Sequence, residues 1–395
     1  MRLITKAIKS LQKRGLRESI KRFLFYMMVN NKMFEDWIVQ KTTQQVNLTL
    51  NDCINQQIDL IVNKLTRNDL FETYMSHRIE PQANDLIYYA KHRRILFSWY
   101  YYWPNNMILH ELENLALSHW SWKYEYKQLW LIYCACLLDK GRDEEAERVL
   151  KRYEKLYKKH EIEQLLPVAD FASRIGISND SIEKSSLIYK MFQKNKKTNH
   201  IVSYMKDKKI AVVSNGDACL GKGLGKEIDA NDIVVRFNCF DNTARGNDYG
   251  NKTSIWVKCL SVQDEDKNIE NMDYVLYSWD VNRFFFSENH LNILYDYACS
   301  HHDKLTYIDG DLIRSLLDDS LLTISTSGCN VFYYLYKLFG NFHNINAYGF
   351  SFLTLDYDNR NHYYENKKIP DELAKFNDLY TEYNFLNNLY FNNKE

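Results

Sequence analysis

The sequence predicts an all-α N-terminal region followed by an α/β domain with a parallel, doubly wound sheet. Ten of the thirteen glycines fall between Gly216 and Gly349, as expected where strand-to-helix turns need glycine and helix interiors avoid it. Short β-branched runs in the same part of the chain alternate with helical stretches, an order that is typical of a parallel sheet. We therefore place a helical accessory domain at residues 1–200 and the α/β domain at residues 201–395.

The composition is that of a globular protein with an ordinary core. The length of 395 residues suggests about two or three domains, and 45% of the residues are hydrophobic. The formal net charge is zero, which argues against bulk affinity for nucleic acid. The eight cysteines are scattered without a CxxC pair, a pattern that favours free thiols in a reducing compartment.

Residues 1–32 combine apolar side chains at helical spacing with many lysines and arginines. One interpretation is a basic amphipathic helix on the inner face of an anionic membrane, and the other is a helix packed on its own domain. No apolar stretch approaches the roughly 20 residues of a membrane span, and the N-terminus lacks a signal-peptide pattern. We expect a cytoplasmic protein, with peripheral membrane contact as the open alternative.

A helical hairpin is predicted at residues 125–160, with its turn at Gly141. It resembles one tetratricopeptide-type unit, but such repeats need about three neighbours to be stable, so a plain helical accessory domain is an equal interpretation. The polar stretch at residues 172–208 is expected to connect the two domains, with one helix around Ser185–Phe192.

The α/β domain is predicted to begin with the β-branched run "IAVVSNG" at Ile210, which ends in an Asn-Gly turn. Further strands are expected in "NDIVVRFN", "KTSIWVKC", "YVLYSW", "KLTYID", "LLTISTSG" and "NINAYGF", with a helix in "CNVFYYLYKLF". Ligands of such sheets bind at the carboxyl ends of the strands. The polar residues at those ends are therefore the candidate binding residues.

These candidates are small hydroxyl, amide and guanidinium side chains beside glycines, which suit a phosphate and a nucleobase. A nicotinamide-dinucleotide site is the competing interpretation. However, the glycines at 221–225 do not give G-x-G-x-x-G directly after a strand, and no P-loop pattern is present. The candidates are Asn215, Gly216, Arg236, Asn238, Thr326, Ser327 and Gly328.

Three segments, in family order, make the C-terminal half similar to the animal-type sialyltransferases. Residues 210–258 resemble the long sialyl motif, residues 325–350 resemble the short one, and "HYYE" at 362–365 resembles the third. The resemblance covers about residues 205–385. Matches to the long motif are Asn215, Gly223, Gly225, Ile228, Asp229, Asp232, Val234, Arg236, Asn238, Asp248, Gly250, Lys252 and Thr253.

The resemblance implies a Rossmann-like fold of the sialyltransferase type, a variant of the GT-B architecture. It also implies a CMP-activated acidic sugar as donor substrate and a glycan as acceptor. Asn215 and Asn238 match family residues that contact the nucleotide and its phosphate, and residues 326–328 match the segment that holds the cytidine and donor. CMP carries one phosphate, so we expect no metal and no further cofactor, and we assign no ligand role to the DxD triplets at 264–266, 309–311 and 356–358.

Two departures from the family pattern concern a disulfide and the catalytic base. Ile210 and Phe342 occupy the positions of the family's paired cysteines. The last family motif, H-x-x-x-x-E, contributes the expected base; if Glu372 is its glutamate, Lys367 stands in the histidine position.

The candidates for acid–base catalysis are therefore His362, Glu365 and Glu372. His362 is the first choice because it lies in the segment that resembles the third motif, and the alternative is a phosphate-binding or structural histidine. Either glutamate can act instead or orient His362, and a carboxylate nucleophile would give a retaining enzyme.

Three functional hypotheses remain. The first is a sialyltransferase of surface-glycan assembly. The second is a CMP-Kdo-dependent Kdo transferase of capsule or lipopolysaccharide synthesis. The third is a non-catalytic helical scaffold, against which the intact nucleotide-side motifs argue.

Overall fold

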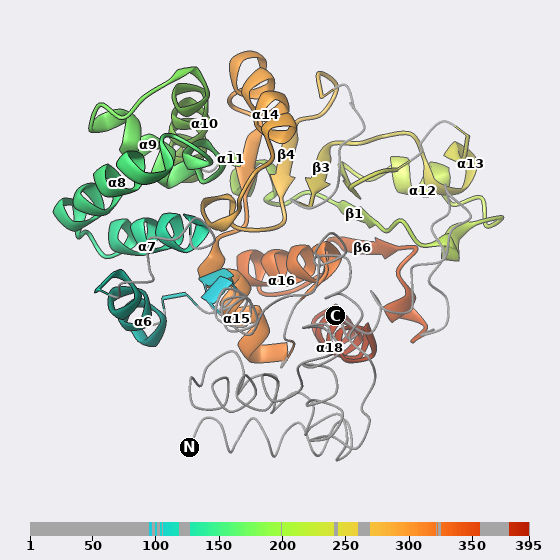
Figure 1. The fold of residues 1–395 in the computed structure, drawn as a ribbon. Coiled ribbons are helices and arrows are strands. Elements are labelled where there is room, and N and C mark those ends of the chain that lie inside the picture. Colours follow the sequence, from blue (N-terminus) through green and yellow to red (C-terminus); the bar gives the residue numbers. More distant parts are fainter. Residues whose placement is uncertain are drawn as a thin grey trace, which may run out of the picture. The chain divides into compact units, whose positions relative to one another are not determined.

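The computed structural model describes residues 95–96, 99–100, 103–104, 106–117, 127–198, 200–240, 244–259, 269–320, 322, 325–355 and 379–394. Internal contacts divide the chain into two units. One holds helices α6 (Asn106–Leu117), α7 (Lys127–Asp139) and α8 (Asp143–Tyr157). The other begins at Lys159 and holds the sheet (Figure 1).

The helical hairpin predicted at 125–160 is confirmed by α7 and α8, which pack against each other. Gly141 makes the turn with φ +68°, a left-handed conformation that glycine adopts without strain. Along α8, Ala146, Leu150 and Tyr153 are buried at helical spacing, while most of the charged residues face solvent. The basic segment at 1–32 lies outside the described residues, as does most of the predicted all-α domain.

The polar stretch at 172–208 does more than connect domains. It contains the end of α9 (Leu166–Arg174), α10 (Asp180–Thr198) and α11 (His200–Met205), and α9 follows the short helix η2 (Ile162–Gln164). Ile188 and Phe192 of α10 are fully buried in the core of the sheet unit. The polar appearance of this stretch comes from the exposed face of an amphipathic helix, and the sheet unit thus includes residues that precede the division predicted at residue 200.

The sheet confirms the predicted parallel α/β arrangement. Its six strands run in the order β5-β4-β3-β2-β1-β6, and every neighbouring pair is parallel. The strands are β1 (Ile210–Val213), β2 (Ile233–Phe237), β3 (Ile255–Lys258), β4 (Tyr274–Tyr277), β5 (Leu305–Tyr307) and β6 (Ile345–Tyr348). Because β2 and β6 lie on opposite sides of β1, the chain reverses direction across the sheet beside β1, which is where open α/β sheets bind ligands.

The strand predicted near residue 323 lies partly outside the described residues, since positions 321, 323 and 324 are not among them. Of its other residues, Leu322, Ser325 and Thr326 have no regular secondary structure. Instead, Thr326 caps the N-terminus of α16 (Ser327–Phe339). Its hydroxyl satisfies a backbone donor of the helix, so the chain at this point is used as a helix start.

Helices cover both faces of the sheet. Val213, Val234 and Trp256 point to the face that shares a buried core with α10 and with α14 (Glu288–Ser300). On the opposite face Phe237 contacts Phe350, and Phe332 of α16 lies between Phe350 and Tyr390 of α18 (Leu379–Phe391). Figure 1 shows α16 and α18 on the other side of the sheet from α10 and α14.

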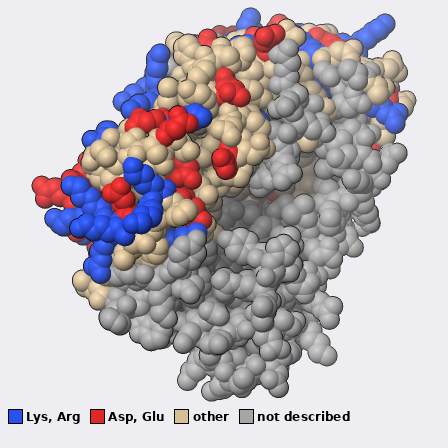
Figure 2. All heavy atoms as spheres, turned by 45° about the horizontal axis from the view of Figure 1, so that its top comes forward, with Lys and Arg blue, Asp and Glu red and all other residues tan. Residues whose placement is uncertain are grey.

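The remaining described elements of the sheet unit are short. They are η3 (Asp217–Cys219), α12 (Gly225–Asp229), α13 (Gly246–Tyr249), η4 (Val281–Arg283), α15 (Gly310–Ser320, which crosses the division between the units) and η5 (Ser351–Leu353). Among the described residues, no helix is long and apolar enough to cross a bilayer. Figure 2 shows acidic and basic side chains interspersed over the coloured surface, in keeping with the zero net charge.

The seven cysteines in the described part of the chain are free thiols, and four of them, Cys134, Cys136, Cys219 and Cys329, are buried. Ile210 and Phe342, which the sequence resemblance matches to a pair of cysteines, are both buried as well.

Candidate active site

Asn215 lies directly after β1 and reaches across to the end of β2. Its Nδ2 donates to the carbonyl oxygen of Phe237 over 2.9 Å. A carbonyl can only accept, so this bond fixes which end of the amide is the nitrogen. The Oδ1 atom of Asn215 has no further hydrogen bond to the described residues, and it therefore presents an acceptor.

Asn238 follows β2 and has the opposite polarity. Its backbone is held at φ 45°, a left-handed conformation that asparagine tolerates better than most residues. The Oδ1 atom accepts from the backbone N–H of Cys259 over 2.7 Å, which again fixes the amide orientation. In the described part of the chain Nδ2 is not engaged, so Asn238 presents donors.

The turns after β1 and β6 meet at the reversal point of the sheet. A Cβ atom on Gly216 would lie 2.5 Å from the carbonyl oxygen of Gly349, closer than real Cβ contacts allow. Gly349 itself has φ +74°. Only glycine at position 216 permits this approach, and the side chains at the ends of both strands are thereby brought together.

The start of α16 joins the same region. A Cβ atom on Gly328 would be 3.2 Å from the Phe350 ring, which in turn contacts the ring of Phe237 at the end of β2. Ser327 shares a hydrogen bond of 2.8 Å with Ser278, the residue after β4. The predicted candidates Asn215, Gly216, Asn238, Thr326, Ser327 and Gly328 are thus brought to the same edge of one sheet.

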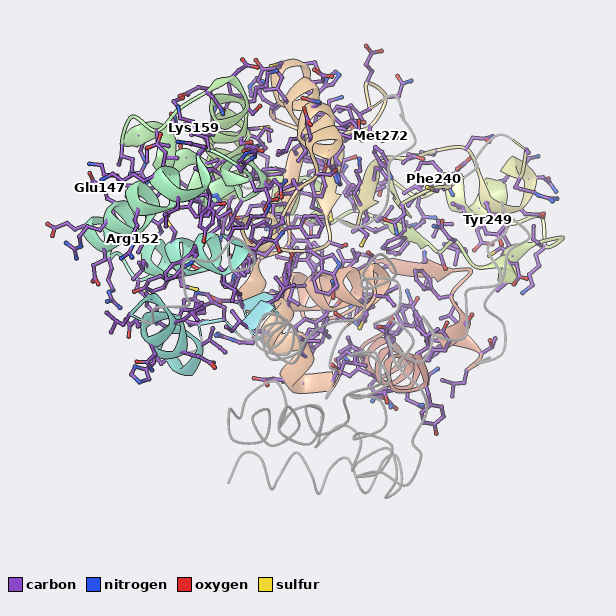
Figure 3. All side chains as sticks on the ribbon, in the orientation of Figure 1. Glu147, Arg152, Lys159, Phe240, Tyr249 and Met272 are labelled. Atoms are coloured by element: carbon purple, nitrogen blue, oxygen red, sulfur yellow. The ribbon has the colours of Figure 1, made fainter. Side chains whose placement is uncertain are left out.

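Arg236 is placed differently. Its side chain is 1% exposed, with Nε donating to the carbonyl of Lys252 over 3.0 Å and an Nη donating to that of Tyr249 over 2.6 Å. The guanidinium also lies over the ring of Phe240, and Figure 3 labels Phe240 and Tyr249 in this part of the molecule. These contacts hold the loop between β2 and β3.

Several other matched residues of the long motif join this loop to the segment between β1 and β2. The carboxylate of Asp248 accepts from the N–H groups of Gly221 and Gly223, both over 2.9 Å, and these two bonds lower its pKa. The carboxylate of Asp229 accepts from the backbone of Asn251 and Lys252. A Cβ atom on Gly225 would lie 2.0 Å from the carbonyl oxygen of Gly246.

Glu382 on α18 is a candidate that the sequence analysis does not name. Its side chain is 2% exposed and accepts two hydrogen bonds from Thr326, one from the backbone N–H over 2.8 Å and one from the hydroxyl. Burial raises the pKa of Glu382 to about 7, against the lowering effect of those two bonds. If Glu382 is taken as the glutamate of H-x-x-x-x-E, Asn377 stands in the histidine position. A search for a histidine at this spacing therefore does not find Glu382.

The predicted catalytic residues His362, Glu365 and Glu372 lie outside the described residues, together with Lys367. Two of the three DxD triplets lie outside them as well. In the third, Asp309 pairs with Lys196 and accepts from the backbone N–H of Asp311. Among the described residues there is no group of three or more His, Cys, Asp or Glu side chains arranged to hold a metal ion.

Comparison with known proteins connects this geometry to a family. The family model described as glycosyltransferase family 29 (sialyltransferase) matches residues 156–394. A segment of 78 residues, 18% of this chain, is 40% identical to the beta-galactoside alpha-2,6-sialyltransferase 2 of Takifugu rubripes and covers 14% of that protein. A segment of 50 residues, 13% of this chain, is 50% identical to the protein of the same name from Danio rerio and covers 10% of it. No solved structure matches the chain.

Proposed function

Because the chain belongs to glycosyltransferase family 29, the family of the sialyltransferases, we propose that it transfers a sialic acid from a CMP-activated donor to a hydroxyl group of a surface glycan. The curated relatives that it matches are named as sialyltransferases of beta-galactosides. The matched segments span only 14% and 10% of those relatives, so the acceptor of this chain is not carried over from their names.

The observation that carries the proposal is the pair of oppositely polarised amides beside a helix N-terminus. Asn238 presents donors, which suit a phosphate oxygen, and Asn215 presents an acceptor, which suits a hydroxyl or amino group of a nucleoside. The first backbone N–H groups of α16, at Ser327 and Gly328, lie at the positive end of the helix dipole. A nucleoside monophosphate ester needs a donor set of this kind.

The reaction breaks the bond between C2 of the sugar and a phosphate oxygen of CMP, and forms a bond between C2 and the acceptor oxygen. The electron pair of the broken bond leaves with CMP, and the acceptor hydroxyl gives its proton to a base. Donors around the phosphate stabilise the charge that develops on the leaving group. We propose Asn238 and the N-terminus of α16 for that task, and Arg236 as support for the loop rather than as a contact.

For the base, His362 remains the first proposal and Glu365 and Glu372 the alternatives. If His362 takes the acceptor proton, His362→Ala lowers turnover by about 100-fold or more, because general base catalysis is worth roughly 10²–10⁴. The affinity for CMP changes little, since the loss lies in the transition state. A variant that mainly weakens CMP binding would make His362 a phosphate contact, and Lys367→Ala serves as the milder comparison.

The donor is tested directly by incubating the full-length protein with CMP-sialic acid and with CMP-Kdo in separate reactions, and measuring release of CMP. We expect acceptor-dependent release from CMP-sialic acid. The Kdo hypothesis gains no support from the family model or from the relatives, and release from CMP-Kdo alone would restore it. Release from neither donor, with any glycan acceptor, would favour the scaffold hypothesis.

A further inference from the structure

The carboxyl group of Glu382 is hydrogen-bonded to Thr326, the residue that caps the N-terminus of α16. It comes from α18, fifty-six residues further along the chain, and both of its oxygen atoms accept from Thr326. The hydroxyl of Thr326 in turn accepts from the backbone N–H of Cys329 over 3.2 Å and so caps the helix. A continuous hydrogen-bonded chain therefore runs from the first turn of α16 to Glu382.

The ionised carboxylate is an acceptor only and matches the two donors of Thr326, whereas a protonated carboxyl also carries an O–H group that needs an acceptor of its own. The surroundings work against that charge. From α16 the thiol of Cys329 faces Glu382, and burial together with the Glu382 charge raises the pKa of this thiol. The cation of α16, Lys337, lies in its last turn, and η5 contributes no titratable side chain. In the part of the chain that the structure describes, no cation compensates the carboxylate.

We propose that Glu382 is a positioning residue that takes up a proton when an anionic ligand binds at the N-terminus of α16. The inference rests on the proposed function, which places the donor phosphate there. Two negative charges at one buried helix end repel each other. Binding of the phosphate therefore favours the neutral carboxyl, and by reciprocity the neutral carboxyl favours binding of the phosphate.

The proton has a defined place in this arrangement. It comes from solvent and binds Oε1, which then donates to the hydroxyl oxygen of Thr326, while Oε2 continues to accept from the Thr326 backbone N–H. The hydroxyl oxygen has two lone pairs, so it can accept this bond and keep the cap on Cys329. Its own hydrogen, no longer taken by the carboxylate, is released toward the ligand. Protonation thus removes a repulsion and adds a donor.

Since burial raises the pKa of Glu382 to about 7, the coupling falls in the neutral range. Affinity for an anion is highest below that pKa, where the carboxyl is already neutral, and declines as pH rises through it. A shift of one pKa unit on binding corresponds to a tenfold change in affinity. The same raised pKa means that ionisation of Glu382 costs folding stability as pH rises from about 4.5 through 7, and Glu382→Gln removes that dependence.

The test is calorimetric binding of CMP to the full-length protein between pH 6 and pH 8.5, in paired buffers of different ionisation enthalpy. The phosphate of CMP also titrates, near pH 6. Proton uptake by the natural protein is therefore compared with that of Glu382→Gln, because the CMP phosphate contributes equally to both. We expect the natural protein to take up more protons than the variant and to lose about tenfold more affinity across the range. The variant, which mimics the neutral carboxyl, binds CMP at pH 8.5 at least as well as the natural protein. Glu288→Gln, an exposed residue in the first turn of α14, keeps the natural pH dependence.

Identical proton uptake and pH dependence in the natural protein and in Glu382→Gln would overturn the proposal while leaving CMP binding, and hence the proposed function, intact. Absence of CMP binding at every pH would instead contradict the proposed function, and this inference with it. A second measurement needs no variant: carbon-13 titration of the glutamate carboxyls should show one resonance with a midpoint near 7 that moves upward when CMP is added. If every glutamate titrates below about pH 5, or the midpoint does not move, the proposal fails.

Discussion

Two groups of residues within the long motif differ in how their side chains are hydrogen-bonded. Around the loop between β2 and β3, three charged side chains bind backbone groups. Asp229 of α12 and Arg236 of β2 bind the loop, and Asp248 in the loop binds Gly221 and Gly223 between β1 and β2. At the ends of β1 and β2, Asn215 and Asn238 each use one end of the amide to hold their position and leave the other end open. The same motif therefore contains residues whose hydrogen bonds hold the fold and residues with one open amide group, which we propose face the ligand.

The difference has a simple physical cause. The loop has little regular structure, so its backbone donors and acceptors need partners, and buried or short side chains supply them. The backbone groups at the strand ends are already hydrogen-bonded within the sheet. The N–H of Ser214, for example, donates to the carbonyl oxygen of Tyr348. Their side chains are thus free to serve a ligand. A match to a family motif does not by itself distinguish these two roles.

The largest effect that tests this comparison is expected at Gly225. A methyl group there would meet the carbonyl oxygen of Gly246 at 2.0 Å, and because the contact is with backbone, neither side can move away cheaply. We expect Gly225→Ala to cost about 3 kcal/mol or more, at or above the upper end of typical overpacking costs. Urea unfolding measures this loss.

Gly141→Ala is the matched control, because position 141 has open space and only the strain of φ +68°. Its cost should be about 1–2 kcal/mol. Equal losses in the two variants would show that the close packing of the loop is not what Gly225 provides.

A smaller loss of stability is expected at Arg236. Arg236→Met keeps an unbranched apolar stem but leaves the carbonyls of Tyr249 and Lys252 without their donors. Each unsatisfied buried group costs about 1–3 kcal/mol, so the free energy of unfolding should fall by about 2–4 kcal/mol. Thermal unfolding and CMP calorimetry on the same sample distinguish a residue that supports the loop from one that contacts the ligand. Lost CMP binding with unchanged stability would move Arg236 into the group that faces the ligand.

The smallest effect on stability, with a clear effect on binding, is expected at Asn238. Asn238→Asp keeps the acceptor for the N–H of Cys259 but replaces the open donor with a negative charge. The fold should therefore be nearly as stable, while the Kd for CMP rises by tenfold or more, equivalent to at least about 1.4 kcal/mol. Calorimetry at low and high salt checks this, since an electrostatic repulsion weakens as salt rises. An unchanged Kd would place Asn238 with the structural residues.

The parallel sheet is well predicted because the signals for its strands and turns are local in the sequence. Runs such as "IAVV" and "IVVRF" are β-branched and are buried in β1 and β2, and the turn after each strand is marked by Asn or Gly. The helical hairpin is likewise predicted from spacing alone. The end of the strand expected near residue 323 is different, because Thr326 caps a helix there.

Other features depend on contacts that local patterns do not contain. Glu382 meets Thr326 across fifty-six residues, and nothing in the sequence around either residue signals that pairing. Arg236 lies in a recognisable motif, but its burial depends on the path of the loop up to Lys252. The polarity of Asn215 and Asn238 is set by backbone partners on other strands. Motif matching finds such positions, and only the structure shows what each side chain does.

We propose that the carboxyl ends of β1, β2 and β6, together with the start of α16, bind a CMP ester. The most direct test is calorimetry of the full-length protein with CMP and with UDP, both in the presence of a chelator. We expect CMP to bind without metal and to raise the melting temperature, UDP to do so much more weakly, and Asn238→Asp to lose the CMP effect. Stabilisation by UDP but not by CMP would mean that this site does not bind a CMP ester.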